Sequence, residues 1–332
     1  MDSSTSELTQ LARYRSSDLV RIRSDEEILS TLDVTGRLEG LPFMPEMLRH
    51  CGETVRVFKR AHKTCDSIWS PGMRRMERTV FLQGLRCDGS AHGGCQAACL
   101  FFWKEQWLTP AVPQDGPPRP AMGSARGGTD DRQRQGCSRE DLHEATRAGS
   151  TAGAEAFACQ ATELARATVP LPSSDVSQFA VDVTSGNVAV GHLSRVLAER
   201  LAERIAARIR RRVVADKWAA VRRDAVVQSP DRLDLKPGDR VAVRSKQEIE
   251  ATLDSRNRNR GLHFSDEMQR YCGGEFRVQA RVERIIHEPT GQMRELKDCV
   301  ILEDVSCQGD FHRFCPRAVY LYWREAWLRK LD

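Results

Sequence analysis

Residues 19–52 read LVRIRSDEEILSTLDVTGRLEGLPFMPEMLRHCG, and residues 240–273 read RVAVRSKQEIEATLDSRNRNRGLHFSDEMQRYCG. A constant offset of 221 residues aligns the two stretches and pairs, for example, Glu46 with Glu267 and Cys51 with Cys272. Self-similarity over this length indicates that one structural unit occurs twice in the chain.

The similarity resumes at an offset of 220 residues. LRCDGSAHGGCQAACLFFWKEQWL (85–108) aligns with VSCQGDFHRFCPRAVYLYWREAWL (305–328). Cysteines, a histidine and two tryptophans recur at matching places. The sequence therefore predicts a tandem repeat, with a first module at 17–108 and a second at 237–332.

Each module is dominated by strand-like patterns. VRIR (20–23) and VAVR (241–244) alternate apolar and polar residues, and a longer alternating run follows each of them. A serine followed by an acidic turn predicts one short helix between the first two strands. LKPGDRVAVRS (235–245) resembles the opening of small SH3-like barrels. We therefore predict an α+β protein with two SH3-like β-barrel modules.

The segments between the modules differ in character. Residues 109–136 are rich in Pro, Gly and charge without apolar periodicity, which predicts a disordered linker. Residues 137–235 are predicted to form a helical middle region. Its longest pattern places apolar residues four apart on one helix face, at Leu193, Leu197, Leu201, Ile205 and Ile209.

A Cys-x4-His-x2-Cys run in each module indicates a metal site. Zinc prefers four tetrahedral ligands drawn from thiolate and imidazole, and three cysteines with one histidine form a common structural set. A glycine in each run lets the backbone turn so that the side chains converge. With an upstream Cys-Gly pair supplying the fourth ligand, we predict about two zinc ions per chain. The predicted ligands are Cys51, Cys87, His92 and Cys95 in the first module, and Cys272, Cys307, His312 and Cys315 in the second.

Further cysteines leave alternatives open. Cys99, Cys65 and Cys299 are extra or substitute ligands. An iron–sulfur cluster using Cys99 is a minor alternative to zinc, because Val319 stands at the matching position of the second module. Cys137 and Cys159 in the middle region form either a helix-packing pair, which is favoured, or an additional thiol site.

The composition narrows the cellular setting. The 332 residues carry a net charge of +5, which permits a nucleic-acid partner without favouring one. No apolar run approaches the ~18 residues of a membrane helix, and the polar N-terminus lacks a signal core. Eleven cysteines in such a chain indicate metal binding or catalysis rather than disulfides. We expect a cytoplasmic protein without a transmembrane segment.

Among common catalytic signatures, GxSxG, HExxH, the P-loop and GxGxxG are missing from the sequence. Duplicated compact modules often serve bivalent binding. The sequence therefore favours a zinc-binding scaffold or adaptor whose partner is another protein. The alternative is a metalloenzyme, or a thiol or iron–sulfur redox protein, with its active site in the cysteine-rich first module; whether the chain is an enzyme stays open.

The motifs resemble those of a bacterial protein family with two Cys/His-bearing SH3-like modules around a central CQATEL segment. The similar segments are residues 87–108, 159–164, 185–188 (SGNV) and 314–328, so the resemblance spans nearly the whole chain outside the linker. It implies an accessory role in a biosynthetic pathway and brings no activity with it. It also implies that the position of His312 varies, which makes Cys299 the first substitute for that ligand.

Overall fold

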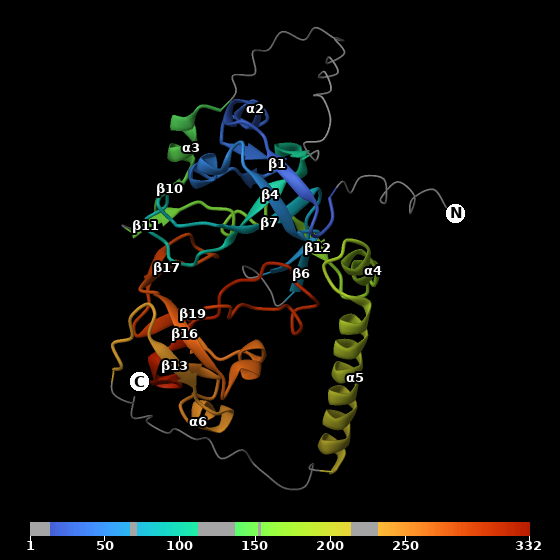
Figure 1. The fold of residues 1–332 in the computed structure, drawn as a ribbon, viewed down its shortest axis with the longest axis vertical. Coiled ribbons are helices and arrows are strands. Elements are labelled where there is room, and N and C mark those ends of the chain that lie inside the picture. Colours follow the sequence, from blue (N-terminus) through green and yellow to red (C-terminus); the bar gives the residue numbers. More distant parts are fainter. Residues whose placement is uncertain (1–13, 67–71, 112–136, 152–153, 214–231) are drawn as a thin grey trace, which may run out of the picture.

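The computed structural model describes residues 14–66, 72–111, 137–151, 154–213 and 232–332. It combines helices with sheets whose strands pair antiparallel, which confirms the α+β class. The two repeated stretches form two sheet-containing halves along the long axis of the molecule, and helix α5 runs beside the second half (Figure 1). Most of the predicted disordered linker, from residue 112 onward, lies outside the described residues.

A five-stranded sheet organises the first half. Its strand order is β8-β7-β4-β1-β9, so the chain's first strand pairs with the last strand of the module. Val20, Ile22 and Leu82 are fully buried on it. The strands are β1 (Leu19–Ile22), β4 (Thr54–Arg60), β7 (Thr79–Arg86), β8 (Leu100–Lys104) and β9 (Leu108–Pro110).

The second half contains a sheet with the corresponding order, β20-β19-β16-β13-β21. Val20 pairs with Val55 in the first sheet, and Val241 pairs with Phe276 in the second, at the repeat offset. Both sheets also shift register at matching places, Val57/Lys59 and Val278/Ala280. The strands are β13 (Arg240–Val243), β16 (Glu275–Arg281), β19 (Cys299–Leu302), β20 (Trp323–Arg324) and β21 (Leu328–Lys330).

The short helix predicted between the first two strands is present in both halves, as α2 (Asp25–Leu29) and α6 (Lys246–Glu250). Ser24 and Ser245 close capping boxes with Glu27 and Glu248, which satisfies backbone N–H groups at both ends of the box. Small elements complete each half: β2 (Arg37–Leu38), β3 (Leu41–Pro42), η1 (Pro45–His50) and η2 (Glu105–Trp107), then β14 (Arg258–Asn259), β15 (Leu262–His263), η3 (Asp266–Tyr271) and η4 (Glu325–Trp327).

The two tryptophans of each module are core residues. Trp103, Trp107, Trp323 and Trp327 are each 0% exposed. Phe43 meets Trp107 edge-on with ring centroids 5.1 Å apart, and the second half repeats this arrangement. These rings therefore stabilise the two sheets and are not accessible for stacking on a nucleic-acid base.

The middle region is only partly helical. It contains α3 (Arg139–Ala145), α4 (Ser177–Thr184) and α5 (Val190–Val213), but also strands β10 (Arg147–Thr151), β11 (Ala154–Phe157) and β12 (Val169–Leu171). β12 joins the hairpin of β5 (Lys63–Asp66) and β6 (Gly72–Arg75) from the first half. The corresponding hairpin of the second half is β17 (Arg284–Ile286) with β18 (Met293–Glu295).

The CQATEL segment, expected to be helical, forms hydrogen-bonded turns instead. The reason is Gln160, whose side chain is buried against β8. Its Oε1 accepts from the Phe102 N–H at 2.9 Å, and its Nε2 donates to the carbonyls of Phe102 (2.9 Å) and Pro42 (3.0 Å). One amide thus satisfies the backbone of an edge strand, as a neighbouring strand would.

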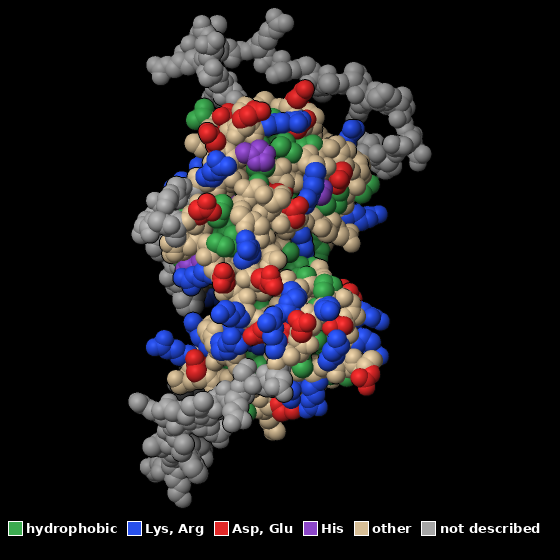
Figure 2. All heavy atoms as spheres, turned by 90° about the vertical axis from the view of Figure 1, so that its left-hand side faces the viewer, with side chains coloured by type: hydrophobic (Ala, Val, Ile, Leu, Met, Phe, Trp, Pro, Cys, Tyr) green, Lys and Arg blue, Asp and Glu red, His purple; other side chains and the backbone are tan. Residues whose placement is uncertain are grey.

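The apolar stripe of α5 is buried only near its start. Val196 packs with Val188 and Phe314, whereas Leu197, Leu201 and Ile205 are 43%, 60% and 51% exposed. Within the described residues, no helix is long and apolar enough to cross a bilayer. On the face in Figure 2, Lys and Arg gather over the second half with Asp and Glu between them, so this face is not uniformly basic.

We expect Gln160→Leu to lower the free energy of unfolding by about 2–4 kcal/mol, because buried backbone groups of β8 and β3 lose their partner. Urea denaturation measures the change. Gln106→Leu is the matched control, since Gln106 is exposed, and it should change stability by less than about 0.5 kcal/mol. Equal effects of the two substitutions would contradict the role assigned to Gln160.

Candidate metal centre

The loop that follows β7 folds tightly back on itself. The N–H groups of His92 and Gly94 both donate to the carbonyl of Gly89, at 3.1 and 2.9 Å. Gly89 has φ +74°, and a Cβ there would lie 2.1 Å from the carbonyl oxygen of Cys95. Only glycine fits this position, and the turn brings the Cys87, His92 and Cys95 side chains to one side of the loop.

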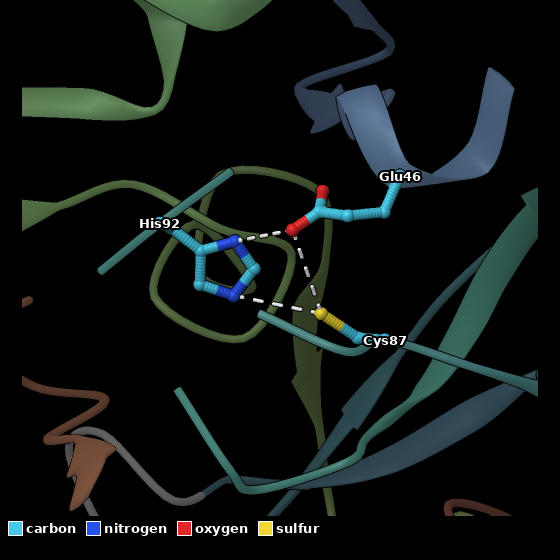
Figure 3. Close-up of side chains that lie close together, drawn as sticks. All are labelled: Glu46, Cys87 and His92. Atoms are coloured by element: carbon cyan, nitrogen blue, oxygen red, sulfur yellow. Dashed lines mark hydrogen bonds and ion pairs between the residues drawn. The ribbon is translucent and has the colours of Figure 1, made fainter. Parts of the chain in front are cut away.

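The imidazole of His92 lies between a carboxylate and a thiol (Figure 3). Its Nδ1 is 2.9 Å from Glu46 Oε1, and its Nε2 is 3.5 Å from Cys87 Sγ. The side chains of His92 and Glu46 are 3% and 1% exposed. Among the described residues, Glu46, Cys87 and His92 form a group of donor atoms close enough together to hold a metal ion.

The charges of this group support one another. Burial by itself would raise the pKa of Glu46, but the contact with His92 and the Ala91 N–H, 3.0 Å away, lower it. Burial would lower the pKa of His92, yet hydrogen bonds with Cys87, Cys95 and Glu46 raise it well above its ordinary value. These contacts favour the protonated form of the ring beside the Glu46 carboxylate.

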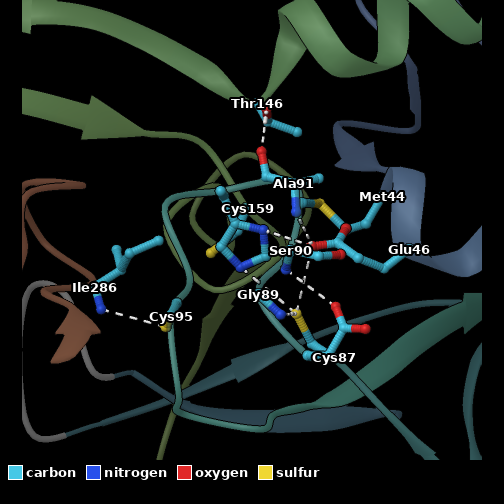
Figure 4. A network of polar contacts seen from close by, with 12 residues as sticks. Met44, Glu46, Cys87, Gly89, Ser90, Ala91, Cys95, Thr146, Cys159 and Ile286 are labelled. Atoms are coloured by element: carbon cyan, nitrogen blue, oxygen red, sulfur yellow. Dashed lines mark hydrogen bonds and ion pairs between the residues drawn. The ribbon is translucent and has the colours of Figure 1, made fainter. Parts of the chain in front are cut away.

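Backbone N–H groups point at both thiols (Figure 4). Gly89 N donates to Cys87 Sγ at 3.3 Å, and Ile286 N, from β17 of the second half, donates to Cys95 Sγ at 3.3 Å. The pKa of Cys95 is lowered because His92 and the Ile286 N–H outweigh its burial. For Cys87, burial outweighs the same imidazole and raises the pKa.

A cavity of about 40 Å³ adjoins these side chains. Three separate parts of the chain form its wall. The first module contributes Cys87, His92, Cys95 and Cys99; the middle region contributes Cys159, Gln160 and Ala161; and the second half contributes Ile286, Glu288 and Arg317. The cavity is large enough for an ion or one to two water molecules.

Cys51 is not a member of the group. It ends the η1 turn, where its N–H donates to Leu48 O. Burial raises the pKa of its thiol to about 11, and the charged residues that also affect this pKa are Asp25, Arg139 and Glu53. Cys272 ends η3 in the same way, near Lys246. The recurring Cys-Gly pair is thus the end of a turn. Glu46, earlier in that turn, contacts the loop instead. The repetition of this glutamate as Glu267 in the second module is the sequence feature that could have identified it.

The loop of the second half has the same backbone turn with a different outcome. His312 N donates to Gly309 O at 2.8 Å, as in the first loop, but the His312 side chain is exposed. Glu267 still accepts the Phe311 N–H at 2.9 Å. Within the part of the chain that the structure describes, Cys307, His312 and Cys315 therefore do not converge on one point.

The remaining cysteines are distributed between core and cavity. Cys299 is buried beside Val282 and Ile301 in an apolar cluster, so it is not placed to substitute for His312 as a metal ligand. Cys99 and Cys159 line the cavity. Cys137 does not line it and lies next to Gly36 instead. Cys65 lies against Cys315.

No protein-family model matches this chain, and searches of curated proteins and of solved structures find no match.

We expect Gly89→Ala to destabilise the metal-free protein by more than about 3 kcal/mol, because the new Cβ overlaps backbone. Gly84→Ala is the matched control: Gly84 has φ +75°, but a Cβ there meets nothing within 4 Å. The control should show only the left-handed backbone penalty, about 1–2 kcal/mol. Denaturant titration compares the two, and similar losses would mean that the loop relaxes.

Proposed function

We propose that the chain binds a single zinc ion through Cys87, His92, Cys95 and Cys159. The orientation of His92 carries this proposal. A metal-ligating histidine usually donates its second ring N–H to a carboxylate, which fixes the tautomer and the ring orientation. Glu46 receives Nδ1–H at 2.9 Å, and this leaves Nε2 free to face the thiols.

The thiol environment supports a metal-bound thiolate. The N–H groups of Gly89 and Ile286 each lie 3.3 Å from a ligand sulfur, where they stabilise negative charge. Mixed thiolate and imidazole ligands with tetrahedral geometry favour zinc. An iron–sulfur cluster normally takes four cysteines, and the imidazole in the middle of this group argues against it.

Cys159 is the fourth ligand that the cavity favours. It lines the same small cavity as Cys87, His92 and Cys95, whereas Cys51 does not. Cys99 also lines the cavity and is the rival for this position. Since the second loop gathers no comparable set, the proposal is one zinc ion per chain rather than two.

The zinc ion would then join the middle region to the first module, because Cys159 precedes the Gln160 that binds β8. This favours a scaffold or adaptor in which two SH3-like modules of a tandem repeat are held in a fixed arrangement. The exposed apolar residues Leu197, Leu201 and Ile205 on α5 offer a surface for another protein. A cytoplasmic accessory of a biosynthetic pathway fits this proposal.

The ligand set is tested by elemental analysis of purified variants. We expect about one zinc ion per chain, lost in Cys87→Ser and His92→Ala. Cys159→Ser should weaken binding strongly, and Glu46→Gln should weaken it about 10–100-fold, measured by competition with a chelator. Cys51→Ser and His312→Ala are the controls that should retain zinc. Retention in Cys87→Ser, or a second zinc lost in His312→Ala, would contradict the proposal.

A metalloenzyme is the second candidate, and the cavity is the observation that favours it. If Cys159 does not bind, three protein ligands leave one position open toward the cavity, as in catalytic zinc sites. Glu288 and Arg317, which pair at 2.9 Å on the cavity wall, would then face that position.

Cobalt substitution separates the two functions. For the scaffold we expect a tetrahedral Co²⁺ spectrum with thiolate charge-transfer bands that azide does not change. Cys159→Ser should weaken those bands, whereas Cys99→Ser should leave them unchanged. A shift of the wild-type spectrum on adding azide would reveal an open position, and it would replace the scaffold with the metalloenzyme.

A further inference from the structure

The two halves contact each other twice through matching positions. Cys95 of the first loop accepts from the Ile286 N–H of the second half at 3.3 Å. Cys315 of the second loop accepts from the Cys65 N–H of the first half at 3.2 Å. The offset of 220 relates Cys95 to Cys315, and the offset of 221 relates Cys65 to Ile286. Each loop thus docks the second cysteine of its Cys-x4-His-x2-Cys run onto a strand of the other half's hairpin, β17 for Cys95 and β5 for Cys315.

One difference separates the two contacts. Where the second half has Ile286, the first half has Cys65, and its Sγ lies 2.8 Å from Cys315 Sγ. A disulfide bond is about 2.05 Å long, so a small movement would join the two atoms. Both thiols are free, and the two residues are 250 positions apart in the chain.

The surroundings favour a reactive thiolate at Cys315. Its sulfur faces the N–H of Cys65 and the backbone N–H of Arg317, and the buried Arg317 guanidinium is close by. Cys315 is 2% exposed and Cys65 is half-buried, so the Cys65 side is the more open side of the pair. Reactive cysteines need this combination of positive surroundings and access.

We propose that Cys65 and Cys315 form a reversible disulfide that locks the two halves together. Hydrogen peroxide is the oxidant class that fits the site. The Cys315 thiolate attacks a peroxide oxygen, the O–O bond breaks, and hydroxide leaves as a sulfenic acid forms. The Cys65 thiol then attacks that sulfur, the S–O bond breaks, and the departing oxygen takes the thiol proton and leaves as water while the S–S bond forms. In total, two thiols and one peroxide give one disulfide and two water molecules.

The lock would act on the cavity beside His92. Arg317, on the cavity wall, is two residues from Cys315, and Ile286, also on the wall, belongs to the matching contact. Oxidation would therefore hold the cavity-lining residues of the second half, Ile286 and Arg317, in place. This inference stands on the contact between the halves and does not require a metal at Cys87. Transient, redox-sensing disulfides are the kind that occur in reducing compartments.

The test treats the reduced full-length protein with a small excess of hydrogen peroxide, alkylates the remaining thiols and digests without reduction. We expect mass spectrometry to find one cross-linked peptide pair joining Cys65 and Cys315, which dithiothreitol removes. Cys65→Ile is the matched variant, because the chain itself has isoleucine at the equivalent position; it should fold and give no cross-link. The control variant Cys51→Ser should still form the cross-link between Cys65 and Cys315.

A second measurement covers the mechanical consequence. The disulfide closes a very long loop, so oxidation should raise the Tm of the wild-type protein by about 5 °C or more, reversibly, and leave the Tm of Cys65→Ile unchanged. A cross-link that pairs either cysteine with a third one, or peroxide treatment that yields only sulfinic acids at both positions, would overturn the proposal. An equal rise of the Tm in Cys65→Ile would overturn it too.

Discussion

The buried contact between Glu46 and His92 is the interaction on which the rest of the site depends. Two ionisable side chains almost without solvent contact are costly to bury, and removing one would leave the other uncompensated. The contact connects the η1 turn to the loop after β7, and it fixes which ring nitrogen faces Cys87. Burying such a pair is expensive in stability, and perturbed ionisable groups of this kind gather at functional sites.

The two halves show how one backbone supports different chemistry. Their sheets share strand order, and both loops close on a glycine carbonyl. The difference lies in side chains: His92 is buried, whereas His312 is exposed and Asp310 beside it binds His192 of α5 at 2.8 Å. The second loop is thus engaged in holding α5, which explains why the cluster of donor atoms occurs in the first half. Neither half is independent of the other, because Gln96 also bonds to the backbone of Arg284.

The middle region completes the first half rather than merely linking the modules. Gln160 satisfies the edge of β8, β12 extends the β5–β6 hairpin, and Asp182 of α4 binds the buried Lys63 at 2.5 Å. Each contact pairs a buried polar group that would otherwise be costly to remove from water. Of these contacts, that of Gln160 borders the cavity, whose wall also includes Ile286 and Arg317 of the second half, so the site belongs to the whole chain and not to one module.

The sequence by itself determined the features that depend on local rules. These are the duplicated strands, the helix caps at Ser24 and Ser245, and the glycine turn that gathers Cys87, His92 and Cys95, because period, capping and loop geometry are set within a few residues. Only the tertiary structure decided which distant group completes the cluster. Glu46 replaced Cys51 there because the turn that carries both directs only one of them at the loop. Spacing along a chain gives no direction in space, and an apolar helix stripe does not say whether anything covers it; on α5, Leu193 near the start is covered, whereas Leu197, Leu201 and Ile205 are exposed.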